Sequence, residues 1–347
     1  METRVCRLYG QNDIRIETEE VAGPGPGEAL VAVAAGGICG SDLHYFQDGG
    51  FGPIRVREPI ILGHEASGVI VDVGAGVTGL AAGDRVALNP SRPCGECVYC
   101  EAGLPIHCLA MRFNGSAMRL PHEQGLFRDR IVVGAAQCVK VGGDVTMAEA
   151  ACSEPLAVCL HARSNAGELE GKRVLVTGAG PIGVLCAAVA REAGASEVVV
   201  TDLQDIPLQA AAAMGATRTI NVARDGAEMD TYAADKGTFD TVFECSAAAP
   251  AVRTAISCVR PRGTIVQVGV TGDLPIPINM LVSKELRYQG TQRFHAEFAQ
   301  AVEMISSRRI DLAPMISSSV PLEEATDAFA LAGNRAKAVK VHLTFAA

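Results

Sequence analysis

The chain has 347 residues, of which 48% are hydrophobic, and it contains 37 glycines and 17 prolines. This length exceeds what one hydrophobic core usually serves, so we expect two globular domains. The 30 basic and 39 acidic residues give a net charge of −9 without any cluster of Lys or Arg, which argues against nucleic acids and anionic membranes as partners.

Cysteine usage bears on the cellular compartment. The first residues, Met1 to Cys6, lack the apolar segment of a secretory signal. The chain nevertheless has twelve cysteines, so we expect reduced thiols in a cytoplasmic protein rather than a disulfide scaffold. Seven of them lie mostly in apolar contexts typical of small buried side chains: Cys6, Cys138, Cys152, Cys159, Cys186, Cys245 and Cys258.

Residues 1–150 have the texture of an irregular β domain. Short alternating or apolar runs are interrupted by Gly and Pro, as in Ala29 to Ala34, Ser67 to Val73 and Arg85 to Leu88. Within this region Cys39, His64 and Glu65 offer sulfur, nitrogen and oxygen ligands. Three protein ligands leave one position open, as a catalytic zinc requires. Each alone would more simply be a core residue; their glycine-rich frame favours the metal site.

Two further features belong to this metal chemistry. Glu154 lies near the expected domain boundary and could reach the catalytic metal as an exchanging ligand or through water. Four closely spaced thiols, in a lobe at about residues 90–110, can close a tetrahedral site around a second zinc: Cys94, Cys97, Cys100 and Cys108. Such a closed site is structural and has no open position for substrate.

From about residue 150 the pattern changes to alternating strands and helices, which predicts a parallel sheet with crossover helices. Predicted strands are residues 172–177, 198–201, 239–244 and 264–268, and predicted helices are 181–193, 208–214 and 251–259. A further strand after Leu286 and a helix at 296–306 precede a short mixed tail.

A glycine-rich turn follows the first of these strands and predicts a dinucleotide site. Gly178, Gly180 and Gly183 fit G-x-G-x-x-G, with Pro181 and Ile182 opening the helix whose N-terminus would receive the pyrophosphate. Asp202 ends the next strand, where a ribose-binding acid belongs. Because residues 203–208 contain no Arg or Lys for a 2′-phosphate, NAD is favoured over NADP. An ordinary strand–helix turn is the alternative interpretation.

Several of these motifs resemble the zinc-dependent medium-chain dehydrogenases over the whole chain. The resemblance rests on the Cys cluster and on Gly63-His64-Glu65-Ala66-Ser67-Gly68, followed by Gly74 and Val77. Glu65, Glu154 and the segment Cys39 to Tyr45 are similar to the sorbitol dehydrogenase branch. The segments Asn89 to Cys94 and Met111 to Met118 are most similar to L-idonate 5-dehydrogenases, which interconvert L-idonate and 5-keto-D-gluconate.

The resemblance implies a two-domain α/β fold. A GroES-like irregular β-barrel catalytic domain would comprise residues 1–150 and 288–347, and a Rossmann cofactor domain with a doubly wound parallel sheet would comprise residues 151–287. It also implies two zinc ions per subunit, one catalytic and one structural. A homodimer or homotetramer would form through strands of the cofactor domain, with Gly263 to Pro277 lining that edge.

The resemblance further assigns roles in catalysis. Zinc would lower the pKa of the substrate alcohol, Ser41 would take the hydroxyl proton, and His44 would pass it towards solvent. Tyr45 and Arg293 match substrate-contacting positions of the sorbitol branch. The chain departs from that branch at Phe294, where a Tyr is common, and at Pro207, where a basic residue commonly follows the ribose acid.

The identity of the substrate depends on a cation. Idonate carries a carboxylate, which an Arg can bind through two parallel hydrogen bonds. We expect Arg112 in this role, with Arg119 and Arg293 as alternatives; without such a residue the substrate would be a neutral polyol such as sorbitol or xylitol. Retention of the proposed ligands argues against a non-catalytic relative, and Glu96 and Glu101 beside the Cys cluster argue against a nucleic-acid-binding zinc ribbon.

Overall fold

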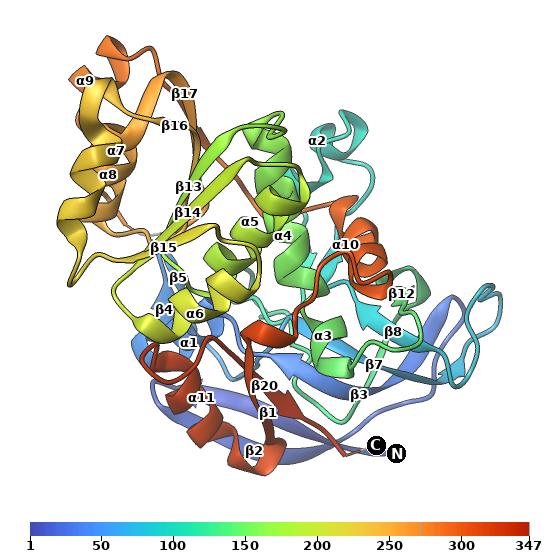
Figure 1. Cartoon of the computed structure of the whole chain (residues 1–347). Helices are drawn as coiled ribbons and strands as arrows, with labels where there is room; N and C mark the ends of the chain where they lie inside the picture. The colour runs from blue at the N-terminus through green and yellow to red at the C-terminus, as the bar shows by residue number, and fades with distance from the viewer. Residues whose placement is uncertain (271, 347) are drawn as a thin grey trace.

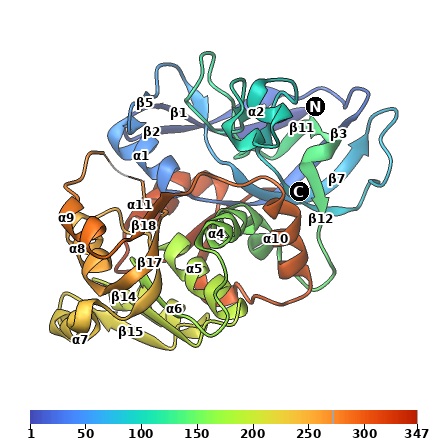
Figure 2. The same cartoon turned by 90° about the horizontal axis from the view of Figure 1, so that it is seen from above.

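The computed structural model of the protein describes residues 1–270 and 272–346. Figure 1 shows two lobes, one built from the N-terminal strands with the last strands of the chain, the other from the segment coloured green to orange. Figure 2 shows the same separation from above, with α4, α5 and α10 between the lobes. Among the described residues, no helix combines the length and the apolar content needed to cross a membrane.

The first lobe is a β domain completed by the C-terminus. Its largest sheet has the order β12-β8-β7-β3-β20-β19, with β11 also paired to β3. The strands are β1 Glu2–Gly10, β2 Asp13–Glu20, β3 Glu28–Gly37, β4 Gly50–Phe51, β5 Ile54–Arg55, β6 Ile60–Ile61, β7 Glu65–Val73, β8 Arg85–Leu88, β9 Ser91–Arg92, β10 Arg112–Phe113, β11 Arg130–Gly134, β12 Cys138–Lys140, β19 Ile316–Pro321 and β20 Lys340–Thr344. The helices are α1 Gly40–Asp48, α2 Val98–Glu101, α3 Met147–Ala151 and α11 Ala325–Gly333, with short 3-10 turns at Pro105–His107, Ala135–Gln137, Ala313–Met315 and Leu322–Glu324.

The second lobe is a parallel sheet in the order β15-β14-β13-β16-β17-β18, the doubly wound arrangement of dinucleotide-binding folds. Its strands are β13 Arg173–Thr177, β14 Glu197–Asp202, β15 Arg218–Asn221, β16 Phe239–Glu244, β17 Val259–Gln267 and β18 Arg287–Gly290. Its helices are α4 Ser153–Ala166, α5 Pro181–Glu192, α6 Asp205–Ala213, α7 Met229–Ala233, α8 Ala249–Cys258, α9 Ile278–Ser283 and α10 Glu297–Ser306, with 3-10 turns at Gly226–Glu228 and Ala234–Lys236. The predicted parallel sheet is confirmed.

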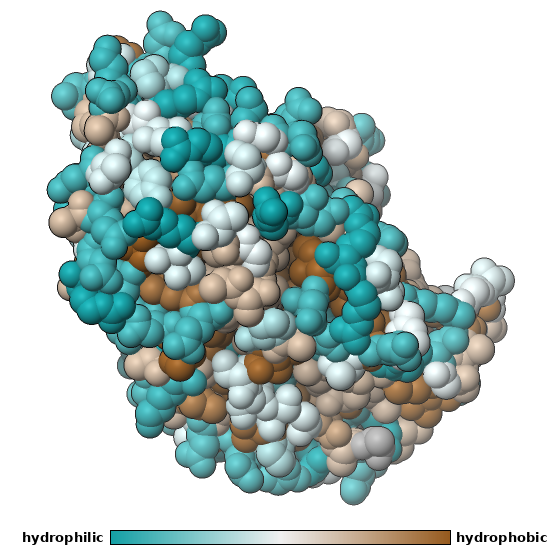
Figure 3. All heavy atoms as spheres, viewed as in Figure 1, coloured by the Kyte–Doolittle hydropathy of each residue, from teal (hydrophilic) through white to brown (hydrophobic). Residues whose placement is uncertain are grey.

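Burial explains why these strands form. Residues 198–200 of β14 are all valines and are fully buried, because helices cover both faces of a parallel sheet. One core cluster packs α4, α5 and α10 against the sheet, and another packs α7 and α8 against it. Figure 3 shows a mostly hydrophilic face on which hydrophobic residues gather towards the middle, where the two lobes meet.

Two predicted boundaries differ from the structure. The expected change of domain after residue 287 cuts through β18, which pairs in parallel with β17, so the cofactor sheet continues to Gly290. Helix α6 begins at Asp205 rather than Leu208. Pro207 is therefore in its first turn, where a missing N–H costs no intrahelical hydrogen bond.

Helix α10 is joined to α4 by a buried polar contact that gives a stability prediction. His161 Nδ1 lies 2.8 Å from Glu297 Oε1, and the two side chains are only 18% and 17% exposed. This hydrogen bond lowers the pKa of Glu297 to about 2. Because the folded pKa lies below the unfolded one, the contact stabilises the protein fully above the unfolded pKa and loses its effect as pH falls towards 2.

Glu297→Gln is therefore expected to lower the free energy of unfolding by about 1 kcal/mol at pH 7. The difference from the wild type should narrow progressively below about pH 5, as Glu297 becomes protonated in the unfolded chain. Denaturant unfolding of both proteins at several pH values measures this difference in unfolding free energy. A difference that stays constant over this range would contradict the assignment.

Candidate active site

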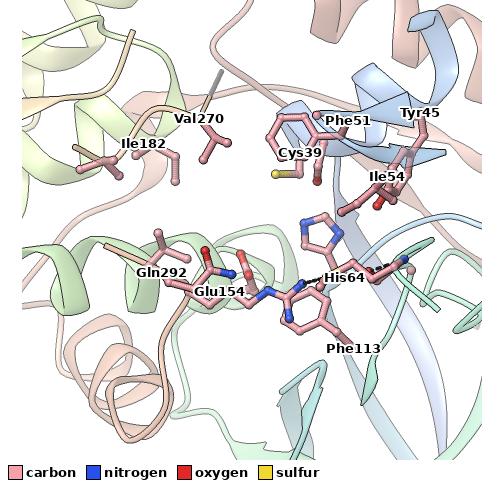
Figure 4. Close-up of a pocket in the computed structure, with 18 of the residues that line it drawn as sticks. Cys39, Tyr45, Phe51, Ile54, His64, Phe113, Glu154, Ile182, Val270 and Gln292 are labelled. Carbon is pink, nitrogen blue, oxygen red and sulfur yellow. Dashed lines mark hydrogen bonds between the residues drawn. The ribbon is translucent and has the colours of Figure 1, made fainter. Parts of the chain in front are cut away.

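A cleft of about 400 Å³ lies between the two lobes. Both lobes line it: Cys39, Ser41, Tyr45 and His64 come from the β domain, and Ile182, Val268 and Val270 come from the cofactor domain. Figure 4 shows Cys39 and His64 on one side of this space, Ile182 and Val270 on another, and the Glu154 carboxylate directed inward. The predicted metal ligands therefore face the predicted dinucleotide domain.

One buried carboxylate holds Cys39 and His64 in place. Cys39 follows β3 and lies at the N-cap of α1, while His64 follows the turn that leads into β7. Asp42 Oδ2 accepts a hydrogen bond from the Cys39 backbone N–H at 3.0 Å, and Oδ1 accepts one from the Gly63 N–H at 3.2 Å. Asp42 Oδ1 also lies 3.7 Å from His64 Nδ1, so the same carboxylate faces the imidazole ring.

Glu65 completes the group from beneath the cleft. One ligand atom from each of Cys39, His64 and Glu65 lies within 4.8 Å of the others. Glu65 is 1% exposed, and its Oε2 forms an ion pair with Lys340. A Cβ atom at Gly37 would lie 2.9 Å from Lys340 Cε, so glycine makes room for this pair.

Charge accumulates at this group in a way that suits a cation. Burial lowers the pKa of His64, but Asp42 and Cys39 outweigh burial and hold the pKa well above its ordinary value. Glu154 is buried in the first turn of α4. Burial, with Glu65 as a further contributor, raises the pKa of Glu154 to about 7, although His64 opposes the shift.

Arg293 supplies a cation on the other side of the cleft. Its backbone has a positive φ of 46°, and its guanidinium lies 4.0 Å from the centre of the Phe113 ring, in cation–π contact. The side chain forms no salt bridge with any described residue, and its Nη2 is 3.1 Å from Met118 Sδ. Burial lowers the pKa of Arg293, while Glu154 and Tyr45 favour its charged form. It is therefore a cation that an anionic substrate could reach.

The helix α1 presents its polar residues to two different spaces. Ser41 and Tyr45 line the cleft, where the Tyr45 hydroxyl accepts a hydrogen bond from the Ala117 N–H at 3.3 Å. His44 lines a neighbouring depression instead. Its Nδ1 is 2.8 Å from Asp48 Oδ2, its ring stacks on Phe51, and its side chain is 48% exposed.

Arg112 and Arg119 do not line the cleft. Arg112 begins β10, and its Nη1 is 3.1 Å from Glu123 Oε1 at the edge of a different depression. Arg119 is exposed and donates through Nη1 to the Met111 carbonyl at 3.4 Å. The expectation that Arg112 binds the substrate carboxylate is corrected accordingly, because its charge is already paired outside the cleft. Of the three arginines considered, the structure places only Arg293 in it.

The four-cysteine cluster forms a separate site around α2. Sulfur atoms of Cys94, Cys97, Cys100 and Cys108 all lie within 4.8 Å of one another, and all twelve cysteines of the chain are free thiols. Backbone N–H groups of Cys94 and Ala110 point at Cys108 Sγ, at 3.2 and 3.3 Å. Backbone amides also lower the pKa of the Cys97 thiol to about 6. Burial has the opposite effect on the neighbouring Cys100 thiol and raises its pKa to about 12. The four-sulfur set has the composition of a closed structural zinc site.

The glycine-rich turn connects β13 to α5 as predicted. Gly178 has a φ of 85°, and a Cβ atom there would lie 2.9 Å from the Ser246 backbone, so this turn requires glycine. Asp202 Oδ2 accepts a hydrogen bond from the Ala179 N–H at 2.7 Å, and Oδ1 accepts one from Gln204 at 2.9 Å. The predicted ribose-binding acid and the glycine-rich turn are therefore held together at the carboxyl edge of the sheet.

Comparison with known proteins identifies the family. A model of the alcohol dehydrogenase GroES-like domain matches residues 25–143, and a model of the zinc-binding dehydrogenase domain matches residues 181–307. The chain therefore belongs to the zinc-dependent medium-chain dehydrogenases, which are NAD(P)-dependent enzymes acting on alcohols. The predicted GroES-like and Rossmann fold classes are confirmed.

Individual relatives lie in the expected branch. The chain is 38% identical to L-idonate 5-dehydrogenase (NAD(P)(+)) of Escherichia coli over 99% of both chains, and 35% identical to sorbitol dehydrogenase of Gallus gallus over 97% of this chain and 94% of the relative. The crystal structure of the E. coli L-idonate enzyme superimposes with a TM-score of 0.95 and covers 99% of each chain. A zinc-binding dehydrogenase from Sinorhizobium meliloti, solved with NADP, is 30% identical with a TM-score of 0.89 over 99% of each chain.

Two residues of the site were not identified from the sequence alone. Asp42 could have been found from its position three residues after Cys39, because an acid at the third helical position commonly accepts a hydrogen bond from the N-cap backbone. Lys340 gives no local signal, because it reaches Glu65 only through the pairing of β20 with β3.

Proposed function

We propose that the protein oxidises a secondary alcohol of a sugar acid, L-idonate to 5-keto-D-gluconate, with NAD as the hydride acceptor. The observation that carries this proposal is the presence of a three-ligand metal group and an arginine without an acidic partner in one cleft. Arg293 offers two parallel donors for a carboxylate, while the metal group addresses the reacting alcohol. The similarity to the E. coli L-idonate enzyme supports the same substrate class.

The residues of the cleft fit a catalytic zinc. The sulfur, nitrogen and oxygen donors are of the types zinc prefers, and the buried Glu65 carboxylate has a donor atom within 4.8 Å of those of Cys39 and His64. A zinc ion held by Cys39, His64 and Glu65 supplies a Lewis acid that lowers the pKa of the substrate alcohol, while NAD accepts the hydride. Glu154 lines the same cleft, and we assign it as an exchanging ligand or as a group that acts through water.

We assign proton transfer and substrate contact to residues of helix α1. We assign Ser41 to accept the hydroxyl proton, because it lines the cleft beside Cys39. We assign His44, which lies further along α1 with its ring partly in solvent, to the outer end of the proton path. Tyr45 borders the substrate with its hydroxyl held by the Ala117 amide. In this assignment Ser41 accepts the proton inside the cleft, and His44 passes it to solvent outside the cleft.

The cofactor site supports NAD rather than NADP. We assign the pyrophosphate to the glycine-rich turn of Gly178, Gly180 and Gly183, with Pro181 and Ile182 at the start of α5, and the ribose hydroxyls to Asp202. A carboxylate at this position repels a 2′-phosphate. Comparing initial rates with NAD and NADP tests the assignment, and a preference for NADP would overturn it.

We also propose a second, structural zinc at Cys94, Cys97, Cys100 and Cys108, and a homo-oligomeric cytoplasmic enzyme. The free thiols support a reducing compartment. Strand β18 is the last strand of its sheet, so this edge could pair with a second subunit. The segment Gly263 to Pro277, expected at the edge, begins within the neighbouring strand β17, and its residue Thr271 lies outside the described residues. Light scattering after size-exclusion chromatography distinguishes monomer, dimer and tetramer.

The substrate is tested by measuring NADH formation with L-idonate, gluconate, sorbitol and xylitol. We expect the highest kcat/KM with L-idonate. A neutral polyol dehydrogenase is the second candidate, favoured by the similarity to sorbitol dehydrogenase and by the mainly apolar wall that Phe51, Ile54 and Phe113 give the cleft. A higher kcat/KM with sorbitol or xylitol would select that candidate.

Arg293→Gln is expected to raise KM for L-idonate about tenfold or more, because it removes a charge-assisted contact to the carboxylate. KM for sorbitol should change less than about threefold, since the contact to a neutral hydroxyl is weaker. Steady-state kinetics on both substrates measure this split.

Arg112→Ala is the matched control for this variant. It also removes one arginine, but at a site paired with Glu123 outside the cleft. Its KM values should therefore remain near those of the wild type. If Arg112→Ala raised KM for idonate and Arg293→Gln did not, the assignment made from the structure would be wrong.

A further inference from the structure

The ring of Phe113 contacts both the metal group and the arginine of the cleft. Phe113 lines the cleft and is 7% exposed. Its ring centre is 5.6 Å from the centre of the His64 ring, and Figure 4 shows the two side chains next to each other. The guanidinium carbon of Arg293 lies 4.0 Å from the same ring centre. One side chain therefore contacts a metal-ligating histidine and the arginine assigned to the substrate carboxylate.

Arg293 has few other contacts that could fix its guanidinium. It forms no salt bridge with any described residue, and its one hydrogen bond to a described residue joins Nη2 to Met118 Sδ at 3.1 Å. A thioether sulfur is a weak acceptor, and Met118 is 54% exposed. An arginine side chain loses much rotamer freedom when it is held in one position. The Phe113 ring is therefore the buried surface against which the guanidinium is held.

The backbone of Phe113 is fixed independently of Arg293. Phe113 ends β10 and pairs with Ser91 of β9. The Asn114 N–H donates to the Pro90 carbonyl at 3.1 Å and continues this pairing by one residue. The four-cysteine lobe connects β9 to β10. A short hairpin of the β domain thus places the ring, whereas Arg293 comes from the segment that follows β18 of the other lobe.

An aromatic ring holds a guanidinium in a different way from a carboxylate. A cation placed over a ring is attracted by the ring quadrupole, and the N–H groups in the guanidinium plane stay free for a ligand. A carboxylate would occupy these N–H groups and neutralise the charge, as Glu123 does for Arg112 at 3.1 Å. The contact with Phe113 therefore orders Arg293 while its charge and its donors remain available.

We propose that Phe113 is a positioning residue for substrate specificity, which holds the Arg293 guanidinium beside the metal group for the carboxylate of a sugar acid. This inference rests on the function proposed for Arg293. Because the same ring contacts His64, it also limits how far the guanidinium can lie from the metal group. A sugar acid is then bound at two points, its hydroxyl at the metal group and its carboxylate at Arg293. A neutral polyol has only the first of these.

The test is a double-mutant cycle on the zinc-loaded full-length enzyme with saturating NAD. Phe113→Leu keeps an apolar side chain but removes the ring, so it should raise KM for L-idonate about fivefold. Its KM for sorbitol and its kcat for either substrate should change less than about twofold. In the Arg293→Gln background, the same substitution should change KM for L-idonate less than about twofold, because the contact is already lost. Phe113→Tyr, which keeps a ring, should stay within about twofold of the wild-type KM for L-idonate.

Phe51→Leu is the matched comparison, because Phe51 also lines the cleft but stacks on His44 rather than on an arginine. It should change KM for L-idonate and for sorbitol by the same factor. An unchanged KM for L-idonate in Phe113→Leu would overturn the proposal, as would an equal rise for sorbitol or an undiminished rise in the Arg293→Gln background. Loss of zinc together with a fall in kcat would assign the ring to the metal group instead. A wild type with a higher kcat/KM for sorbitol than for L-idonate would overturn the proposed substrate and this inference together.

Discussion

Replacing His64 with alanine is expected to lower kcat/KM about a thousandfold or more and to remove the zinc from the cleft. Only Cys39 and Glu65 would remain of the three-donor group, and Glu65 is already paired with Lys340. Two protein donors cannot fix the geometry of the metal, so the site could no longer hold it. The alcohol would then keep a pKa too high for efficient removal of its proton.

Metal analysis by mass spectrometry distinguishes this explanation from simple unfolding. The wild type should contain two zinc ions per chain and His64→Ala one, with the parallel sheet intact by circular dichroism. His107→Ala is the matched control, because this exposed histidine lies in the four-cysteine lobe and outside both donor groups. It should retain both metals and full activity. A His64→Ala protein that keeps two zinc ions and wild-type turnover would refute the assignment.

Replacing Cys100 with serine should lower the stability of the lobe around α2 more than it lowers catalytic activity. The lobe around α2 buries none of the residues of that helix, so its fold depends on the cysteine cluster rather than on a hydrophobic core. Loss of the structural zinc should lower the free energy of local unfolding by about 3 kcal/mol or more. The cleft group does not include Cys100, so the remaining folded enzyme should still contain its catalytic zinc.

Limited proteolysis and zinc content measure this effect together. Cleavage within residues 90–110 should become faster in Cys100→Ser, while Cys245→Ser, which removes a thiol outside the cluster, should resemble the wild type. Dialysis of the wild type against a chelator should release zinc from the cleft first, because the open site exposes its metal to solvent and the closed site does not. Unchanged proteolysis in a Cys100→Ser protein that has lost one zinc would contradict a structural role.

Local sequence patterns anticipated the parts of the protein that depend on local geometry. The turn from β13 to α5 requires glycine at Gly178, and the four-cysteine lobe is closed by residues only fourteen positions apart, so both could be recognised before the fold was known. The grouping of Cys39 with His64 and Glu65 was predicted from their donor types and their glycine-rich frame, and the structure brings their donor atoms together.

Contacts between distant segments were harder to anticipate. Arg112 lies close in sequence to the cysteine lobe and was predicted to bind the substrate carboxylate, yet it forms an ion pair with Glu123 outside the cleft. Arg293 reaches the cleft from beyond β18, where its orientation depends on a positive φ and on the Phe113 ring. The predicted domain boundary fell inside β18 for a similar reason. This short exposed strand is defined by its pairing with β17 rather than by its own burial.

The contact between Lys340 and Glu65 has a consequence for the order in which the enzyme matures during synthesis. All three residues of the metal group lie within the first 65 positions, but Glu65 acquires its charged partner only when β20 pairs with β3. Lys340 is among the last eight residues of the chain and leaves the ribosome after the whole cofactor domain. During synthesis, Glu65 therefore lacks its ion pair with Lys340 until β20 pairs with β3.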